Sequence, residues 1–157
     1  MVTIITGERN SGKTTFFEYW YNEVQRGIGF CTKKIYEEEE FIGYDLEFLP
    51  DKETIPFMTV LQPQQEYNFD RVITEKLAID SSVFPFAQKW INECFCNPEE
   101  PVWIDEIGTL ELAGGGFDPI VRWALQVGTD IRLVTRKNVL YKLVRHYGIE
   151  KFSLVYV

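Results

Sequence analysis

Between a short apolar run and a helical segment, the chain reads Gly7-Glu8-Arg9-Asn10-Ser11-Gly12-Lys13-Thr14. This stretch matches the pattern of a glycine, four free positions and then Gly-Lys-Thr, which is typical of a phosphate-binding loop. The run Val2 to Ile5 before it is apolar and β-branched, and helical spacing begins at Thr15. Because such a loop has to connect a strand to a helix, the flanking segments support the interpretation.

Each residue type in this loop suits a triphosphate for its own reason. Gly7 and Gly12 allow backbone conformations that turn several N–H groups inward around a phosphate chain. Lys13 provides a point charge for the β- and γ-phosphates and a catalytic role, and the Thr14 hydroxyl suits a magnesium ion. The residues expected to bind nucleotide are Gly7, Glu8, Arg9, Asn10, Ser11, Gly12, Lys13, Thr14 and Thr15.

The size and charge of the chain restrict its class. A chain of 157 residues with 45% apolar and 15% aromatic residues predicts a single domain, residues 1–157, with a packed core. The formal net charge of −8 opposes nucleic acid or an anionic membrane as a partner, because both would repel it. We therefore expect a nucleoside triphosphate as the ligand, and the sequence identifies no protein partner.

The remaining composition favours a cytoplasmic protein. No apolar run approaches the roughly 18 residues that span a bilayer, and the segment Val2 to Ile5 is too short for a signal peptide. Cys31, Cys94 and Cys96 contain no Cys-x-x-Cys pair, and His146 is the single histidine. Zinc binding is therefore not expected.

Apolar periodicity and turn residues predict alternating strands and helices. The expected strands are 2–6, a hairpin of 29–35 and 42–48 around the acidic run Glu37 to Glu40, and 57–61, 102–104, 131–134 and 152–157. The expected helices run from Thr15 to Gly27 with an apolar face of Phe16, Trp20 and Val24, from Ser81 or Ser82 to Asn97, from Asp118 to Gly128, and from an Asn138 cap to Gly148. Between Tyr67 and Ile79 the pattern permits a strand at Val72 and Ile73 or a helix from Thr74.

This alternation predicts an α/β fold with a mostly parallel sheet, helices on both faces and the hairpin as an antiparallel addition. Ligands of such sheets bind beyond the carboxyl ends of the strands. The phosphate loop, Asp105 with Glu106, and Thr135 all fall at such ends.

The strand Val102-Trp103-Ile104 leads into two successive carboxylates, Asp105 and Glu106. In phosphate-loop enzymes an aspartate at this place holds magnesium opposite the loop hydroxyl, so we assign Asp105 with Thr14 to the metal. Glu106 is then positioned to orient and partly deprotonate a water for attack on the γ-phosphorus. Two acidic residues that merely end a strand at the surface are the simpler alternative.

Three segments together resemble the cancer-related nucleoside-triphosphatase family, also called the THEP-type family of P-loop NTPases. They are the phosphate loop, the stretch Gly29-Phe30-Cys31-Thr32 with the following hairpin, and Ile104-Asp105-Glu106-Ile107-Gly108-Thr109-Leu110-Glu111-Leu112. The resemblance implies a three-layer, RecA-like sheet and slow, Mg²⁺-dependent hydrolysis of nucleoside triphosphates with little choice among bases. It also implies phosphate binding by Gly7, Gly12, Lys13 and Thr14, with Asp105 serving the metal and Glu106 the water.

Two departures from the family pattern affect the expected site. Family loops commonly carry Pro-Gly where this chain has Arg9-Asn10, so Arg9 is a candidate phosphate contact. Thr135 resembles the polar residue that ends the family strand beside the loop, but Arg136-Lys137 replaces an apolar pair. Thr135 and Arg136 are therefore candidate sensors of the γ-phosphate, with a solvated surface arginine as the alternative for Arg136.

Other functions remain open from the sequence alone. A small-molecule kinase would use Asp105 or Glu106 on a substrate hydroxyl, and a regulatory or accessory module would bind nucleotide with negligible turnover. Thr32, Lys33 and Lys34 either line the nucleotide site or are solvated hairpin residues. The triplet Gly114 to Gly116 is read as a mobile connection.

Overall fold

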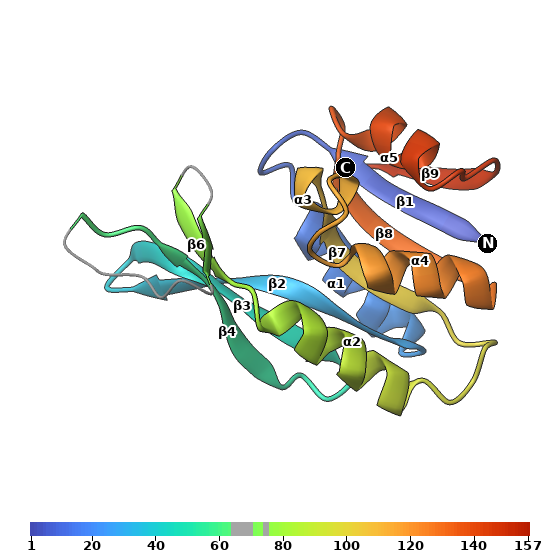
Figure 1. Ribbon diagram of the computed structural model, residues 1–157, viewed down its shortest axis with the longest axis horizontal. Helices are drawn as coiled ribbons and strands as arrows, with labels where there is room; N and C mark the ends of the chain where they lie inside the picture. Colours follow the sequence, from blue (N-terminus) through green and yellow to red (C-terminus); the bar gives the residue numbers. More distant parts are fainter. Residues whose placement is uncertain (64–70, 74–75) are drawn as a thin grey trace.

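The computed structural model describes residues 1–63, 71–73 and 76–157. Its strands are β1 Val2–Gly7, β2 Ile28–Glu37, β3 Glu40–Leu49, β4 Thr54–Val60, β5 Arg71–Ile73, β6 Leu77–Asp80, β7 Val102–Ile107, β8 Ile131–Arg136 and β9 Phe152–Tyr156. Its helices are α1 Lys13–Val24, α2 Val83–Cys94, α3 Thr109–Leu112, α4 Asp118–Val127 and α5 Leu140–His146. The described strands form one sheet in the order β5-β6-β4-β3-β2-β7-β8-β1-β9 (Figure 1).

The sheet has a parallel half and an antiparallel half. Strands β2, β7, β8, β1 and β9 pair in parallel, which confirms the predicted α/β architecture. The predicted hairpin is present as β2 with β3, and β4, β6 and β5 continue it with further antiparallel pairs. The antiparallel addition is thus larger than the hairpin alone. Strand β8 lies between β1 and β7, so the two strands that carry the expected site are not neighbours.

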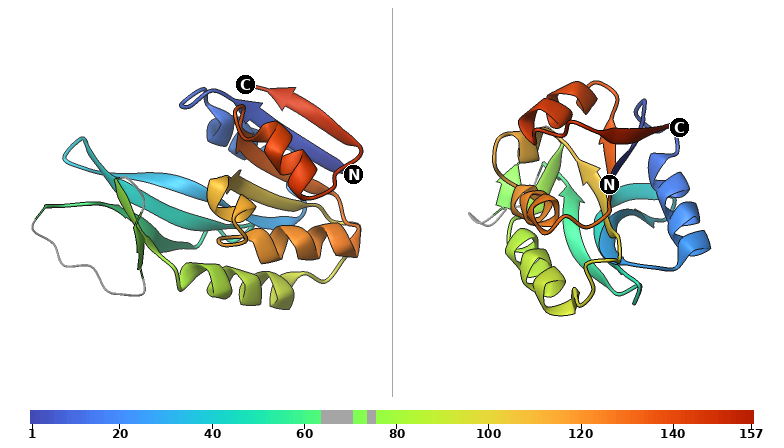
Figure 2. Two further views of the ribbon diagram at one scale, coloured as in Figure 1. Left: turned by 45° about the horizontal axis from the view of Figure 1, so that its top comes forward. Right: turned by 90° about the vertical axis from the view of Figure 1, so that its right-hand side faces the viewer.

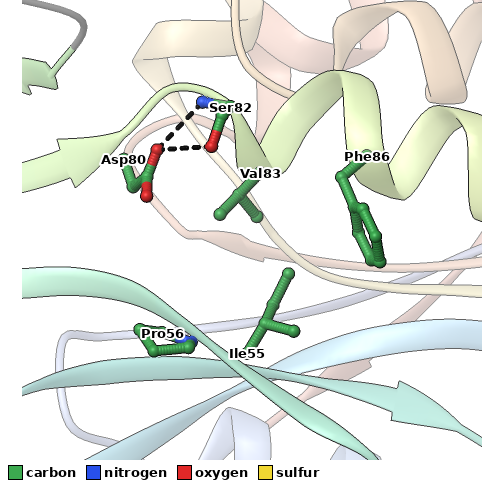
Figure 3. A pocket seen from close by; sticks show the side chains of 6 residues that line it. All are labelled: Ile55, Pro56, Asp80, Ser82, Val83 and Phe86. Atoms are coloured by element: carbon green, nitrogen blue, oxygen red, sulfur yellow. Dashed lines mark hydrogen bonds between the residues drawn. The ribbon is translucent and has the colours of Figure 1, made fainter.

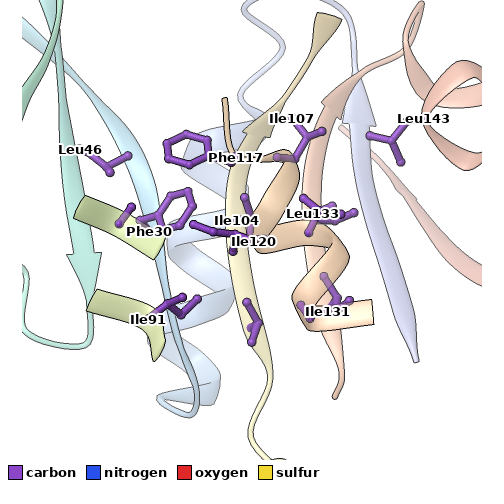
Figure 4. Close-up of a cluster of buried hydrophobic side chains, with 14 of the residues drawn as sticks. Phe30, Leu46, Ile91, Ile104, Ile107, Phe117, Ile120, Ile131, Leu133 and Leu143 are labelled. Carbon is purple, nitrogen blue, oxygen red and sulfur yellow. The ribbon is translucent and has the colours of Figure 1, made fainter. Parts of the chain in front are cut away.

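The helices cover both faces of the sheet, as predicted. Helix α1 packs on one face, while α2, α4 and α5 pack on the other (Figures 1 and 2). The larger core lies under α2, α4 and α5, where Phe30, Ile104, Phe117 and Ile120 interlock, with the Phe30 and Phe117 ring centroids 4.4 Å apart (Figure 4). Because Ile104 is fully buried in this core, strand β7 is fixed immediately before its two carboxylates.

The face of α1 that packs on the sheet is wider than the predicted one. Phe17 and Tyr21 are the buried residues, and both rings meet the fully buried Trp103, at 5.4 and 5.3 Å between centroids. Phe16, Trp20 and Val24 are only partly buried beside this cluster. The predicted row also packs here, since the Trp20 ring centroid lies 5.4 Å from that of Trp103, but the more deeply buried row was not predicted. Both rows have the same spacing of four, and only the position of β7 selects between them.

Several predicted boundaries also move. Helix α1 ends at Val24, with Gln25 rather than Gly27 in the left-handed conformation that follows the last turn. Val139 replaces Asn138 at the N-terminus of α5. In the ambiguous segment, the described part is strand at β5 and β6, and residues 67–70, 74 and 75 lie outside the described residues. Within the described part of the chain, no helix combines the length and apolarity needed to cross a membrane.

Candidate functional site

The phosphate loop connects β1 to α1, and its two glycines are required for different reasons. Gly12 has a φ of 94°, in the left-handed region that favours glycine. Gly7 is required for space, because a Cβ there would collide with the backbone oxygen of Val157 and with Ser11 Oγ. The loop also holds Asn10 at a φ of 61°, where glycine stands in the family pattern noted above. A tight, inward-turned loop results.

Lys13 is folded back into this loop. It is the first residue of α1 and is only 6% exposed, and its Nζ donates a hydrogen bond of 2.6 Å to the Glu8 carbonyl oxygen. The ammonium group therefore lies beneath the loop backbone, at the N-terminus of the helix. A phosphate bound there would meet both the helix dipole and this positive charge.

A direct contact joins the loop to the acidic strand. Thr14 Oγ1 donates a hydrogen bond of 2.8 Å to Asp105 Oδ2, across 91 residues of sequence. Because β8 separates β1 from β7, the contact is made from the first turn of α1 to the carboxyl-terminal half of β7. Thr14, Lys13 and Asp105 consequently belong to one site.

Asp105 is fully buried, and burial raises its pKa to about 7. The hydrogen bonds from Thr14 and from the Thr32 backbone N–H oppose this rise, whereas the neighbouring Glu106 charge adds to it. Asp105 Oδ1 has no hydrogen-bond partner among the described residues. A buried carboxylate with one unpartnered oxygen would be stabilised by a cation.

The donor atoms at this point fit magnesium. Magnesium prefers hard oxygen ligands, needs only one or two from the protein, and takes others from phosphate and water. The unpartnered Asp105 Oδ1 and the Thr14 hydroxyl provide such oxygens next to the phosphate loop.

Glu106 is held by Arg136 of β8, the strand between β1 and β7. Its Oε1 accepts a hydrogen bond of 2.9 Å from Arg136 Nε at the end of β8, and their side chains are 28% and 51% exposed. The preceding Thr135 is fully buried and donates from Oγ1 to the Ile107 carbonyl oxygen at 2.8 Å. This bond ties β8 to β7 where their register shifts between Ile104 and Ile107. Glu106 and Arg136 are thus fixed on neighbouring strand ends.

Lys137, the residue after Arg136, connects the end of β8 to the phosphate loop. The Lys137 backbone N–H donates to the Gly7 carbonyl oxygen at 3.1 Å, and Lys137 Nζ lies 3.2 Å from Glu8 Oε1. Arg9 and Thr15 are exposed, and Arg9 forms no ion pair within the described ranges. The structure therefore brings all the predicted site residues to one end of the parallel half of the sheet.

Glu111 is a positioning residue that the sequence analysis did not assign. It is only 4% exposed, and its carboxylate accepts hydrogen bonds from the backbone N–H groups of Gly108, at 2.8 Å, and Phe117, at 3.1 Å. Gly116 has a φ of 58°, and a Cβ there would collide with this carboxylate. Gly116 is therefore fitted around Glu111, and the triplet forms a turn in which Gly114 and Gly115 donate backbone hydrogen bonds to Glu111 and Leu110. A glutamate three residues after Gly108 is the signal that was available.

The three hairpin residues in question take separate roles. The backbone N–H of Thr32 acts to lower the pKa of Asp105, and Lys33 Nζ lies 2.6 Å from Glu18 Oε1 on α1. Lys34 Nζ donates to Asn10 Oδ1 of the phosphate loop at 3.5 Å. The hairpin thus touches the site from the side of β2.

A surface pocket lies elsewhere, at the start of α2 (Figure 3). It is lined by Ile55, Pro56, Asp80, Ser82, Val83 and Phe86. Asp80 Oδ1 is already bonded to the Ser82 N–H and hydroxyl, at 3.1 and 2.6 Å. Since no residue of the phosphate loop lines it, this pocket has no part in the site.

Comparison with known proteins supports the fold and assigns a family. A protein-family model described as NTPase matches residues 2–156. Two solved structures resemble the fold: THEP1 from the hyperthermophile Aquifex aeolicus, with 20% identity, a TM-score of 0.72, and coverage of 99% of this chain and 89% of that one; and a human cancer-related nucleoside triphosphatase, with 22% identity, a TM-score of 0.73, and coverage of 99% and 87%. A comparison with curated protein sequences returns no match.

Proposed function

The chain belongs to the NTPase family and is a nucleoside-triphosphate hydrolase, and we propose that it releases phosphate slowly, with Mg²⁺, and with little choice among bases. The observation that carries this proposal is the hydrogen bond of 2.8 Å between Thr14 and Asp105. It joins the phosphate loop to the only strand end in the described chain that places two successive carboxylates in the site.

The loop binds the triphosphate through its backbone. Its inward N–H groups and the N-terminus of α1 contact the phosphate oxygens, and Lys13 Nζ exchanges the Glu8 carbonyl for the β- and γ-phosphates. All of these groups contact phosphate, and the sequence lacks the Asn-Lys-x-Asp segment that reads guanine. This supports low selectivity for the base.

Magnesium would be held by the Thr14 hydroxyl and the Asp105 carboxylate together with phosphate oxygens. When bound, the ion supplies positive charge for the oxygens of the β- and γ-phosphates as the bond between them breaks. The raised pKa of Asp105, about 7, means that this carboxylate binds a cation in exchange for a proton.

Glu106 acts on the water. Its carboxylate orients the attacking water and accepts one proton as the water oxygen bonds to the γ-phosphorus. The bond from the γ-phosphorus to the bridging oxygen breaks, and the diphosphate leaves with its new charge beside Lys13. The products are a nucleoside diphosphate and inorganic phosphate.

Arg136 senses the γ-phosphate. Its Nε donates to Glu106, and no Nη atom has a hydrogen-bond partner among the described residues. The Nη groups are therefore available to a phosphate that arrives next to Glu106. Because Glu106 must turn from Arg136 toward the water, this ion pair supports slow turnover.

We further propose that residues 1–157 act as a single domain in the cytoplasm without nucleic acid or a membrane. The free thiols of Cys31, Cys94 and Cys96 suit a reducing compartment, and the net charge of −8 disfavours polyanions.

The test is phosphate release from ATP, GTP, CTP and UTP, with Mg²⁺ and with a chelator. We expect release from all four with Mg²⁺, none with the chelator, and a loss of about 100-fold or more in Lys13→Ala and in Glu106→Gln. Equal release by wild type and Glu106→Gln would remove the role given to Glu106.

A further inference from the structure

We propose that the hairpin face, defined as Lys34, Tyr36, Phe41 and Tyr44, is a second ligand site beside the phosphate loop, for a small planar molecule that carries a phosphate, such as a nucleoside monophosphate. This inference rests on the proposed function, because that function places the γ-phosphate at Glu106.

The four side chains lie on one face of the β2–β3 hairpin. Lys34 is paired with Tyr44 and Tyr36 with Phe41 across the two strands, and cross-strand partners share a face. The Phe41 ring centroid is 5.0 Å from that of Tyr44 and 5.9 Å from that of Tyr36. The three rings form a continuous ladder from the exposed tip toward the loop.

The inner end of this ladder meets the candidate site. Lys34, the cross-strand partner of Tyr44, is bonded to Asn10 of the phosphate loop. Burial raises the pKa of Tyr44, and the next largest influences are the charges of Arg9, Glu106 and Arg136. Tyr44 therefore lies at the end of the ladder that faces the phosphate loop, within the electrostatic influence of Arg9, Glu106 and Arg136.

This position excludes the base of the hydrolysed nucleotide as the ligand of the ladder. In the proposed complex the γ-phosphate lies at Glu106, and the α-phosphate, ribose and base follow in order away from it. A ring on the loop side of the hairpin, under the influence of the Glu106 charge, is therefore placed to contact whatever approaches the terminal phosphate. That ligand is a second molecule.

The chemistry of the face identifies the class of ligand. The ladder ends in Tyr36, which is 57% exposed, and exposed aromatic rings stack on bases of any kind. Lys34 and Arg9 make no ion pair with any carboxylate in the described part of the chain, so both can bind a phosphate. The acidic run Glu37 to Glu40 continues beyond the ladder and would repel a long polyanion. The aromatic rings, the two basic side chains and the acidic run together favour a short nucleotide over a nucleic acid.

The test uses the whole protein, saturated with Mg²⁺ and a non-hydrolysable ATP analogue, and titrates adenosine monophosphate by calorimetry. We expect saturable binding with one equivalent of the monophosphate while the analogue stays bound. Tyr44→Leu, which keeps an apolar side chain but removes the ring, and Lys34→Ala should each weaken the monophosphate by about tenfold. Tyr36→Ala, an exposed position that tolerates truncation, should weaken it as well.

Matched controls lie away from the hairpin. Tyr19→Leu changes another exposed tyrosine, on α1, and Lys151→Ala another exposed lysine, before β9; both should bind the monophosphate like wild type. Absence of saturable binding, displacement of the analogue, or equal weakening by the controls would overturn the proposal. Phosphate release by wild type without monophosphate is measured separately, so a protein that hydrolyses ATP but binds no monophosphate contradicts this inference alone.

Discussion

Thr14 Oγ1 donates its hydrogen bond to Asp105 Oδ2 at 2.8 Å, although 91 residues separate the two in sequence. Thr14 stands in the first turn of α1 and Asp105 near the end of β7, and β8 lies between their strands. The order of the strands in the sheet therefore brings these two residues together. Their hydrogen bond places the two expected metal ligands in direct contact.

Replacing Asp105 with asparagine should raise the stability of the protein at high pH and lower its activity. The folded protein binds the Asp105 proton more tightly than the unfolded chain, because the pKa rises from 3.8 to about 7. The contribution of this group to stability is therefore fully present below the lower value and lost as pH rises through the higher one. In a chelator, we expect Asp105→Asn to match wild type only below pH 3.8, and to exceed its free energy of unfolding by roughly 1 to 4 kcal/mol at pH 8.

Urea denaturation under these two conditions measures this difference, and phosphate release measures the accompanying loss of activity. An Asn variant that is less stable than wild type at pH 8 would show that the Asp105 charge is already compensated in the metal-free protein.

Removing Arg136 should affect turnover more than binding. Its guanidinium holds Glu106 and is available to charge that develops on the γ-phosphate, so Arg136→Ala should lower kcat by about tenfold or more and change KM little. Arg136→Lys should restore part of kcat, because it keeps the charge without the forked geometry. The control is Arg145→Ala, which removes an exposed arginine at the end of α5. Unchanged kcat in Arg136→Ala would identify a merely solvated ion pair.

Adding a methyl group at Gly116 should destabilise the protein through Glu111. Gly116 and Gly114 both have positive φ, 58° and 84°, but only at Gly116 would a Cβ collide with the Glu111 carboxylate. Gly114→Ala should cost about 1 to 2 kcal/mol from backbone strain alone, and Gly116→Ala should cost distinctly more. Chemical denaturation of the two variants isolates the collision, and equal losses would mean that Glu111 moves aside freely.

Acid should remove the stabilisation that Asp118 provides between α4 and α5. Burial acts to raise the pKa of Asp118, but hydrogen bonds from Arg122, Tyr147 and His146 outweigh it and hold the pKa below the usual 3.8. The stabilisation is therefore present above pH 3.8 and lost as pH falls through the lowered pKa. Asp118→Asn should lose about 1 to 3 kcal/mol at pH 7 and approach wild type in strong acid.

Thermal unfolding against pH measures this loss. Asp51→Asn, which changes an exposed carboxylate, provides the control and should show no comparable pH dependence. A constant gap between Asp118→Asn and wild type down to strong acid would contradict the assignment.

Local patterns predicted much of the fold. The strand before the phosphate loop, the acidic-tipped hairpin, and the helix that starts at Asp118 with Pro119 in its first turn all formed where expected, because turn and cap residues act within a few positions of themselves. The more deeply buried row of α1 and the role of Glu111 were missed. The face of α1 depends on a partner far away in the sequence, Trp103. Glu111 depends on the N–H groups of Gly108 and Phe117, which are near in sequence but reach its carboxylate only once the chain turns through the left-handed Gly116.

The sequence by itself determined which groups are available: a loop able to hold phosphate, a hydroxyl and two carboxylates for metal and water, and the α/β alternation that carries them. Only the tertiary structure decided that β8 stands between the two key strands, and therefore that Arg136 meets Glu106 and that Thr14 reaches Asp105. The reason is physical. Residue type and spacing act locally, whereas strand order follows from burying both faces of one sheet at once, a condition that no single segment contains.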